Sequence, residues 1–359
     1  MPAETSAPPA EDFRLHPPSR SMRALGVVVT LYEKLSGLSG QFRPPVTPVD
    51  RSIAMRVAAV DPVADGVVSL RLVVADGSEL PGWSPGAHLD LTLPSGRVRQ
   101  YSLTGDPAVR DHWRIAVRRI ADGGGGSREV HGLRAGDAIT VRGPRNAFPF
   151  IRVDTYLFVA GGIGITPIRP MLRDAIARGV DWRFVYTGRD RASMPFLAEC
   201  EQLAASYPDR VHVRPDDEYG VPDGQQILAY APAGAALYTC GPPPMIDAIR
   251  AQIPSDRIAT LHYERFSAAP VVGGEPFTVV LARSGHVVRV GAEESALTAI
   301  RGVLPDVSYS CQQGYCGTCP VGLLGGDVEH HDRCLSEADR AQKVAICVSR
   351  GHGRITLDL

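Results

Sequence analysis

The pattern of apolar and polar positions divides the chain into segments with different expected folds. In the first long segment, short runs of alternating apolar and polar residues recur, separated by Gly, Pro and Asp. Such runs are typical of antiparallel strands with one buried face, joined by turns. We therefore predict an antiparallel β-barrel over residues 51–152. Its expected strands cover residues 55–60, 67–74, 88–93, 113–119 and 138–141.

After Phe150 the apolar runs become continuous and alternate with helical patterns. Continuous apolar runs are typical of strands that are covered on both faces, and their alternation with helices indicates a parallel sheet. We predict an α/β domain of this kind over residues 153–268, and a domain of this kind is a candidate for nucleotide binding. Its expected strands cover residues 156–160, 183–186, 211–214, 236–239 and 258–263.

The C-terminal part of the chain shows a third pattern. Residues 277–290 read as two strands around a turn at Ser284 and Gly285, which predicts a β-hairpin. Residues 295–303 show helical spacing, and a loop rich in Cys and Gly follows. We therefore predict a small α+β domain over residues 275–359.

The first 50 residues read as an extension and not as a domain. They begin with a Pro- and Ser-rich stretch, and three prolines at positions 44, 45 and 48 close the segment. Between these ends, apolar residues at helical spacing could form a short amphipathic helix, whose apolar face must be buried against another surface. These residues are Met22, Leu25, Val29, Tyr32 and Leu35.

The overall composition is that of an ordinary globular protein. The formal net charge is -1 and 44% of the residues are hydrophobic, so nothing in the charge favours binding to nucleic acid. The N-terminus lacks the apolar core of a secretory signal, and no apolar run near it approaches the ~20 residues of a membrane span. Seven cysteines, four of them bunched between residues 311 and 334, favour a reducing compartment in which thiolates bind metal. We expect a monomeric, cytoplasmic protein.

The cysteine spacing indicates an iron-sulfur site. Cys311, Cys316 and Cys319 form a C-x4-C-x2-C loop, and Cys347 follows on an expected strand. This is the plant-type 2Fe-2S spacing, in which one loop supplies three thiolates and a distant residue supplies the fourth. A zinc site with four thiolates is the alternative, although such sites usually use two C-x2-C pairs. Cys334 lies in a charged segment that we expect to be a solvated loop.

A glycine-rich turn follows the expected strand at 156–160 and opens a helix. Its backbone N-H groups suit a pyrophosphate, with Thr166 as the N-cap and Pro167 as the first helical residue. Tight packing of strand on helix is the alternative. Cys240, Gly241 and Pro242 end another expected strand at the same edge of the sheet, where open α/β sheets bind ligands, although a rigid turn would also explain them. The glycines of the first turn are Gly161, Gly162 and Gly164.

Two segments of the expected barrel suggest a ligand with a ring and an anionic group. Arg99, Tyr101 and Leu103 alternate along one face of an expected strand with Ser102 on the other, so one face offers a cation and an aromatic ring. Downstream, a Gly- and Ser-rich loop could form an anion-binding nest of backbone N-H groups, and a flexible loop is the alternative. That loop contains Gly125, Gly126 and Ser127.

In this order the motifs resemble the ferredoxin-NADP reductase superfamily, specifically its phthalate dioxygenase reductase and vanillate demethylase reductase type. The resemblance extends over residues 51–359. It implies an FMN-binding β-barrel, an NAD(P)H-binding α/β domain and a β-grasp ferredoxin domain that holds a 2Fe-2S cluster. FMN is favoured over FAD because no adenine site is evident after the barrel. NADH is the usual donor of such proteins, while Arg189 and Arg191 leave NADPH as an alternative.

The resemblance also implies roles for individual residues. Arg99 and the loop from Gly125 to Ser127 would hold the flavin phosphate, and the residues from Tyr101 to Leu103 would lie at the flavin ring. The glycine turn and the segment from Cys240 to Pro242 would bind NAD(P)H. The residues expected at the reacting rings are Tyr101, Ser102, Cys240 and Phe266.

The activity implied by the resemblance is electron transfer. Electrons would pass from NAD(P)H through FMN to the 2Fe-2S cluster, and from there to a separate terminal oxygenase, either of the Rieske type or a cytochrome P450. A flavin and iron-sulfur redox sensor without an oxygenase partner is the alternative. The sensor would be reduced slowly by NAD(P)H and would not pass electrons quickly to one-electron acceptors.

Overall fold

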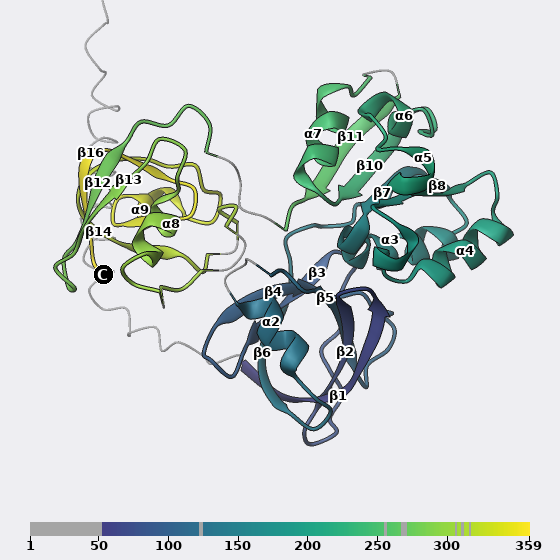
Figure 1. The fold of residues 1–359 in the computed structure, drawn as a ribbon, viewed down its shortest axis with the longest axis horizontal. Helices are drawn as coiled ribbons and strands as arrows, with labels where there is room; N and C mark the ends of the chain where they lie inside the picture. Colours follow the sequence, from purple (N-terminus) through teal and green to yellow (C-terminus); the bar gives the residue numbers. More distant parts are fainter. Residues whose placement is uncertain are drawn as a thin grey trace, which may run out of the picture. The chain divides into compact units, whose positions relative to one another are not determined.

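The computed structural model describes residues 52–121, 125–254, 257–266, 271–305, 307–309, 312–315 and 317–359 (Figure 1). Three separate sheets follow one another along these residues. The amphipathic helix expected before residue 51 lies outside the described part of the chain. Within that part, no helix combines the length and the apolar character needed to cross a membrane.

The first sheet is antiparallel, has six strands in the order β4-β3-β6-β1-β2-β5, and confirms the predicted barrel. A bridge between Leu103 and Ile115 brings the end of one edge strand to the other edge strand, so the sheet closes at that point. Trp113, Leu70 and Leu89 are at most 1% exposed in the core that it encloses. The strands are β1 (Ser52–Ala64), β2 (Val67–Val74), β3 (Ala87–Thr92), β4 (Val98–Ser102), β5 (Trp113–Arg118) and β6 (Ala138–Asn146).

The Gly- and Ser-rich stretch after β5 forms a helix where we expected a loop. Helix α2 (Gly126–Gly132) begins after Gly125, whose φ of 81° lies in the left-handed region that glycine tolerates. The Glu129 side chain accepts hydrogen bonds from the backbone N and the Oγ of Ser95, both at 2.7 Å, and so ties the helix to the β3–β4 turn. The expectation of a loop was therefore wrong for residues 126 and 127, which form the first turn of a helix.

The second sheet is parallel, with the order β11-β10-β7-β8-β9. Along β7, Tyr156 and Phe158 belong to the core on one face, whereas Leu157 and Val159 belong to the core on the other face. This alternation confirms a parallel sheet that is buried on both sides. The strands are β7 (Thr155–Gly161), β8 (Asp181–Gly188), β9 (Val211–Pro215), β10 (Ala235–Cys240) and β11 (Ile258–Glu264).

Helices connect these strands. They are α3 (Ile165–Ala177), α4 (Leu197–Ser206), α5 (Asp216–Tyr219), α6 (Gly224–Leu228) and α7 (Pro243–Ala251), with short 3-10 turns η1 (Gly162–Gly164) and η2 (Arg191–Ser193). The expected N-cap at Thr166 was wrong, because η1 leads directly into α3 and makes Gly164 the capping position. Thr166 Oγ1 instead donates a hydrogen bond to the carbonyl of Ile163 at 3.1 Å. Pro170 lies buried inside α3.

The third sheet is mixed and confirms the predicted α+β domain. Its order is β13-β12-β16-β14-β15, and β12 pairs with β13 in antiparallel and with β16 in parallel fashion. The strands are β12 (Phe277–Leu281), β13 (Val287–Val290), β14 (Pro320–Glu329), β15 (Lys343–Ala345) and β16 (Arg350–Leu357), with helices α8 (Ala296–Arg301) and α9 (Glu337–Arg340).

Cys347 does not lie on a strand, contrary to our expectation. It lies in the turn between β15 and β16. The N-H groups of Val348 and Ser349 both donate to the carbonyl of Ala345, at 3.2 and 3.0 Å, so the chain reverses at this point instead of extending the strand.

Candidate functional site

A cavity of about 890 Å³ brings together several of the residues expected to bind cofactors. This volume lies within the range usual for ligand sites and leaves room for a flavin. Residues of β4, β5, α2, the end of β11 and the chain around Tyr309 to Tyr315 contribute to its wall. The expected site residues that line it are Arg99, Tyr101, Ser102, Gly126, Ser127, Thr166 and Phe266.

One end of this cavity is suited to an anion. A Cβ on Gly126 would lie 2.7 Å from Cγ of Arg99, so only glycine lets the Arg99 side chain lie against the first turn of α2. Arg99 and the first two residues of α2 line the same cavity, and the Arg99 guanidinium donates from Nη1 to the carbonyl of Val98 at 2.8 Å. A cation beside backbone N-H groups suits a phosphate. The Arg99 guanidinium also lies 4.5 Å from the ring centroid of Tyr309. These residues fit the phosphate end of a flavin nucleotide.

A carboxyl group and two hydroxyl groups lie at the wall of the same cavity. Glu264 is the last residue of β11, and its Oε2 lies 3.5 Å from Ser102 Oγ, at the outer limit of a hydrogen bond. Burial raises the pKa of Glu264 to about 8, and the Ser102 contact opposes this only in part. Burial also raises the pKa of Tyr101 to about 12. Both side chains are therefore neutral near pH 7, and each can donate a hydrogen bond.

Sequence reasoning missed Glu264 and pointed only to the neighbouring Phe266. The available signal was a carboxylate at the end of an expected parallel strand, where open α/β sheets bind ligands. It also missed Arg118 and Tyr309, which line the cavity from β5 and from the stretch before Cys311. Neither belongs to a motif, so their role emerges only from the fold.

The glycine turn and the segment after β10 pack directly against each other, as expected for one shared edge of the sheet. A Cβ on Gly161 would lie 2.5 Å from Cδ of Pro242, and one on Gly164 would collide with the carbonyl of Cys240. These two glycines are therefore required by close packing, which was the alternative explanation. Gly162 is different, because it has a φ of 52° and only Arg118 Nη1 lies near its missing Cβ, at 3.8 Å. Its backbone N-H remains suited to a pyrophosphate.

Some expected site residues do not line the cavity. Leu103 belongs to the barrel core and Cys240 to the core of the parallel sheet, and both have 0% exposure. Burial raises the pKa of the Cys240 thiol well above its usual range, so the group is a neutral thiol. The other expected site residues that do not line the cavity are Gly125, Gly161, Gly162, Gly164, Pro167, Gly241 and Pro242. Any contact of these residues with a cofactor would be made through the backbone or after rearrangement.

The described part of the cysteine site fits a buried cluster. Cys319 and Cys347 are each 3% exposed and pack in the core of the third domain, while Cys311 and Cys316 lie outside the described residues. The described residues between Cys311 and Cys319 have several left-handed backbone angles, with φ of 55° at Gln312, 77° at Gly314 and 68° at Gly317. A loop that turns repeatedly can direct its N-H groups toward a cluster sulfur. Cys200 is buried in α4, apart from this site.

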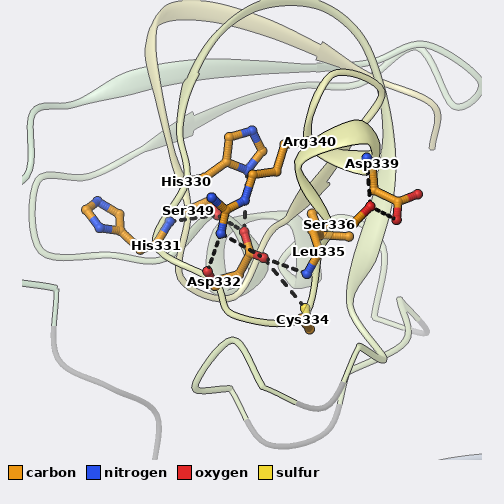
Figure 2. A network of polar contacts seen from close by, with 9 residues as sticks. All are labelled: His330, His331, Asp332, Cys334, Leu335, Ser336, Asp339, Arg340 and Ser349. Carbon is orange, nitrogen blue, oxygen red and sulfur yellow. Dashed lines mark hydrogen bonds and ion pairs between the residues drawn. The ribbon is translucent and has the colours of Figure 1, made fainter.

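The segment around Cys334 is a loop in which His331 and Arg333 are exposed, as expected, but Asp332 within it is buried. The Asp332 side chain has 0% exposure and lies within a network of polar contacts (Figure 2). The sequence did not indicate this burial, because it does not show that Arg340 and Ser349 turn toward Asp332.

Comparison with known proteins assigns the three domains to known families. Residues 55–150 match the oxidoreductase FAD-binding domain, residues 158–251 the oxidoreductase NAD-binding domain, and residues 279–350 the 2Fe-2S iron-sulfur cluster binding domain. The order is the one expected from the sequence motifs.

Curated relatives cover nearly the same length. A putative toluene-4-sulfonate monooxygenase system reductase subunit from Comamonas testosteroni is 41% identical over 317 residues, which are 86% of this chain and 99% of the relative. Phthalate dioxygenase reductase from Burkholderia cepacia is 32% identical over 316 residues, which are 86% of this chain and 98% of the relative.

Solved structures agree with these relatives. The structure of phthalate dioxygenase reductase matches with a TM-score of 0.63 at 32% identity and covers 86% of this chain and 98% of its own. Full-length CYP116B46 from Tepidiphilus thermophilus matches with a TM-score of 0.61 at 39% identity over 88% of this chain, which is 44% of that longer chain. The chain therefore belongs to the phthalate dioxygenase reductase type of the ferredoxin-NADP reductase superfamily, an oxidoreductase that carries electrons from a pyridine nucleotide through a flavin to a 2Fe-2S cluster and on to a terminal oxygenase.

Proposed function

We propose that this protein takes electrons from NADH, holds FMN in the cavity of the barrel domain, and binds its 2Fe-2S cluster through Cys311, Cys316, Cys319 and Cys347. The observation that carries the proposal is the shared cavity. Its wall combines the anion-binding end at Arg99 with hydroxyl and aromatic groups and with residues close to the cysteine loop. A cofactor placed there would lie next to both the nucleotide domain and the iron-sulfur domain.

Each part of the wall has a distinct task in this proposal. Arg99 and the first turn of α2, with Gly126 and Ser127, hold the phosphate. Tyr101 and Ser102 would donate hydrogen bonds to the ring system, and Phe266, which also lines the cavity, would pack against it. When bound, the flavin accepts a pair of electrons from the nicotinamide and releases them singly, which matches a two-electron donor to a one-electron acceptor.

Glu264 holds a proton beside the reacting rings. Because its pKa is raised to about 8, the carboxyl group is mostly protonated near pH 7. It can therefore donate a hydrogen bond, either to Ser102 or to a group in the cavity. The glycine turn, with Thr166, and the segment from Cys240 to Pro242 bind the nucleotide at the adjoining edge of the sheet.

One feature supports FMN over FAD, although the matching family is described as FAD-binding. The Tyr309 ring centroid lies 4.5 Å from the Arg99 guanidinium, and Tyr309 is itself only 7% exposed, so an adenosine extending past Arg99 would have to displace this ring.

The experiment that tests this is release of the flavin by acid followed by chromatography against FMN and FAD standards. We expect FMN as the main species, at close to one per chain. FAD as the main species would contradict the proposal. Arg99→Ala should lower the affinity for FMN at least tenfold, because a charge-assisted contact to phosphate is lost, whereas Arg283→Ala, at an exposed pair with Asp358, should leave it unchanged.

The acceptor in this proposal is the iron centre of a terminal oxygenase. The relatives include a phthalate dioxygenase reductase and a putative monooxygenase system reductase subunit, and the matched structures include a self-sufficient cytochrome P450 monooxygenase. Reconstitution with a Rieske-type oxygenase and with a cytochrome P450 would separate the two acceptors. A redox sensor would instead be reduced slowly and would fail with both.

We further propose the domain limits 51–152, 153–268 and 275–359, with residues 1–50 as an extension. The ranges matched by the three families fall within these limits. We also propose that the protein is a monomer and that it lies in the cytoplasm. The location follows because a site of four thiolates is best preserved in a reducing compartment.

A further inference from the structure

The carboxylate of Asp332 lies at the centre of a buried polar network in the iron-sulfur domain (Figure 2). Oδ2 accepts a hydrogen bond from the backbone N of Leu335 at 2.9 Å, and Oδ1 accepts one from Ser349 Oγ at 3.4 Å. Arg340 donates to the Asp332 carbonyl at 2.7 Å and lies 3.9 Å from the carboxylate. His330 Nδ1 lies 3.4 Å from Oδ1. A buried carboxylate costs stability unless several such partners satisfy it.

This network touches both parts of the chain that carry the cysteines. The backbone N of Arg333, next to Asp332, donates to the carbonyl of Gly314 at 2.9 Å, and Gly314 lies between Cys311 and Cys316. Ser349 follows Cys347 by two residues and is only 2% exposed.

Gly314 is held tightly from both sides. A Cβ on it would lie 3.0 Å from Cα of Asp332 and 2.8 Å from Cγ2 of Val348, the residue after Cys347. Its φ of 77° also requires glycine. The cysteine loop, the Asp332 segment and the Cys347 turn are therefore packed directly against one another, and a shift in one would displace the others.

We propose that Asp332 is a positioning residue for the 2Fe-2S cluster. Its carboxylate fixes the segment 330–335, which holds the cysteine loop through Arg333 and the Cys347 turn through Ser349. This inference rests on the cysteine assignment of the proposed function. It adds a residue that neither the cysteine spacing nor the family matches assign to the site.

Two properties of the cluster follow from this role. A loop held in place retains its cluster, so loosening the network should speed cluster loss. The carboxylate also places a negative charge near the cysteine loop, and this charge disfavours the addition of an electron to the cluster. A neutral side chain of the same shape should therefore make the cluster easier to reduce.

The test compares Asp332→Asn and Ser349→Ala with Asp339→Asn in the full-length holoprotein. Asn keeps the shape of Asp332 and removes its charge, whereas Ser349→Ala removes the two links between the segment and the Cys347 turn, one to Asp332 Oδ1 and one from the backbone N of His331. Asp339 is the matched control, because it belongs to the neighbouring contacts with Ser336 and Lys343 and has no contact to Ser349. The measurements are iron content, the rate of absorbance loss with a chelator, the reduction potential from an EPR-monitored titration, and the melting temperature.

We expect Asp332→Asn to favour the reduced cluster by about tenfold, which is a shift of about 59 mV to more positive potential for one electron. We expect Asp332→Asn and Ser349→Ala to lose the cluster at least fivefold faster than wild type, and Asp339→Asn to match wild type. A lower melting temperature with unchanged potential and cluster loss would overturn the proposal, because Asp332 would then be merely structural. If Asp332→Asn fails to fold, the proposal is overturned by a Ser349→Ala variant that loses its cluster at the wild-type rate. A wild-type protein without any 2Fe-2S signal would instead show that the cysteine assignment is wrong.

Discussion

At the scale of single residues, the cavity holds groups that burial keeps neutral. Glu264 is the clearest, because a carboxyl group at a cofactor site is normally ionised near pH 7. Burial raises its pKa to about 8, so the folded protein keeps a proton that the unfolded chain would release near pH 4.5. A protonated Glu264 can donate a hydrogen bond beside Ser102, which an ionised one cannot.

This raised pKa predicts a specific dependence of stability on pH. Between pH 4.5 and about 8 the folded state binds the extra proton, so the free energy of unfolding contributed by this group falls as the pH rises through that window. Glu264→Gln removes the titration. A pKa difference of one corresponds to about 1.4 kcal/mol in the free energy of unfolding. We therefore expect the variant and wild type to have equal free energies of unfolding at pH 5. At pH 9 the variant should be more stable by at least about 1 kcal/mol.

Urea unfolding of the holoprotein at a series of pH values checks this. Glu79→Gln, at an exposed carboxyl group, should follow the wild-type curve throughout. A constant difference between Glu264→Gln and wild type across the range would contradict the raised pKa.

The sequence identified residues whose chemistry is local and missed those that depend on the fold. Cys319 and Cys347 could be assigned because thiolate spacing is a property of the chain itself. The resemblance placed Leu103 at the flavin, yet its side chain belongs to the barrel core. Arg118 and Glu264 reach the cavity only because β5 and β11 end there, which no local pattern reveals.

At the scale of elements, the strands were predicted well because their apolar periodicity reflects burial. The continuous runs that became β7 and β10 are buried on both faces, whereas β2 alternates. Helix α2 was missed because a run of glycines favours loops, and its formation depends on tertiary contacts of Glu129 with Ser95. The start of α3 was misplaced by two residues because η1 precedes it.

The segments that follow β8 and β9 favour NADH over NADPH. Arg191 could have recognised a 2'-phosphate, but its guanidinium already pairs with two carboxylates. Nη1 donates to Glu201, and Nε and Nη2 donate to the two carboxylate oxygens of Glu218 at 2.6 and 3.0 Å. Asp216 and Asp217 add further acidic groups at the start of α5. A 2'-phosphate placed there would meet carboxylates, so we expect a higher kcat/KM with NADH than with NADPH.

Steady-state rates with a one-electron acceptor measure this preference. Glu218→Gln together with Glu201→Gln should reduce the ratio of kcat/KM for NADH over NADPH at least tenfold, or about 1.4 kcal/mol, because the two changes free Arg191 from both carboxylates and remove two repulsive charges. Asp358→Asn, which breaks an equivalent exposed pair with Arg283, should leave the ratio unchanged. A wild-type kcat/KM for NADPH equal to that for NADH would refute the argument.

At the scale of the whole molecule, the three domains supply one stage of electron transfer each, although the flavin domain comes before the nucleotide domain along the chain. The domain order could be predicted from the sequence, since each domain carries its own motif. The contacts that bring them to one cavity could not, because they join residues distant in sequence. Arg99 of the barrel meets Tyr309, and the Gln313 side chain donates to the carbonyl of Arg265 at the end of the nucleotide domain.

The most direct test of this account is the visible absorbance of the purified holoprotein during anaerobic titration with NADH, followed by EPR of the reduced sample. The account predicts that NADH bleaches the flavin and the cluster bands together and produces the EPR signal of a reduced 2Fe-2S cluster. Cys347→Ser should lose that EPR signal while its flavin is still bleached, and Cys334→Ser should behave as wild type. A flavin that is bleached while an intact cluster stays oxidised, or a protein in which NADH changes neither band, would contradict the proposed path of electrons.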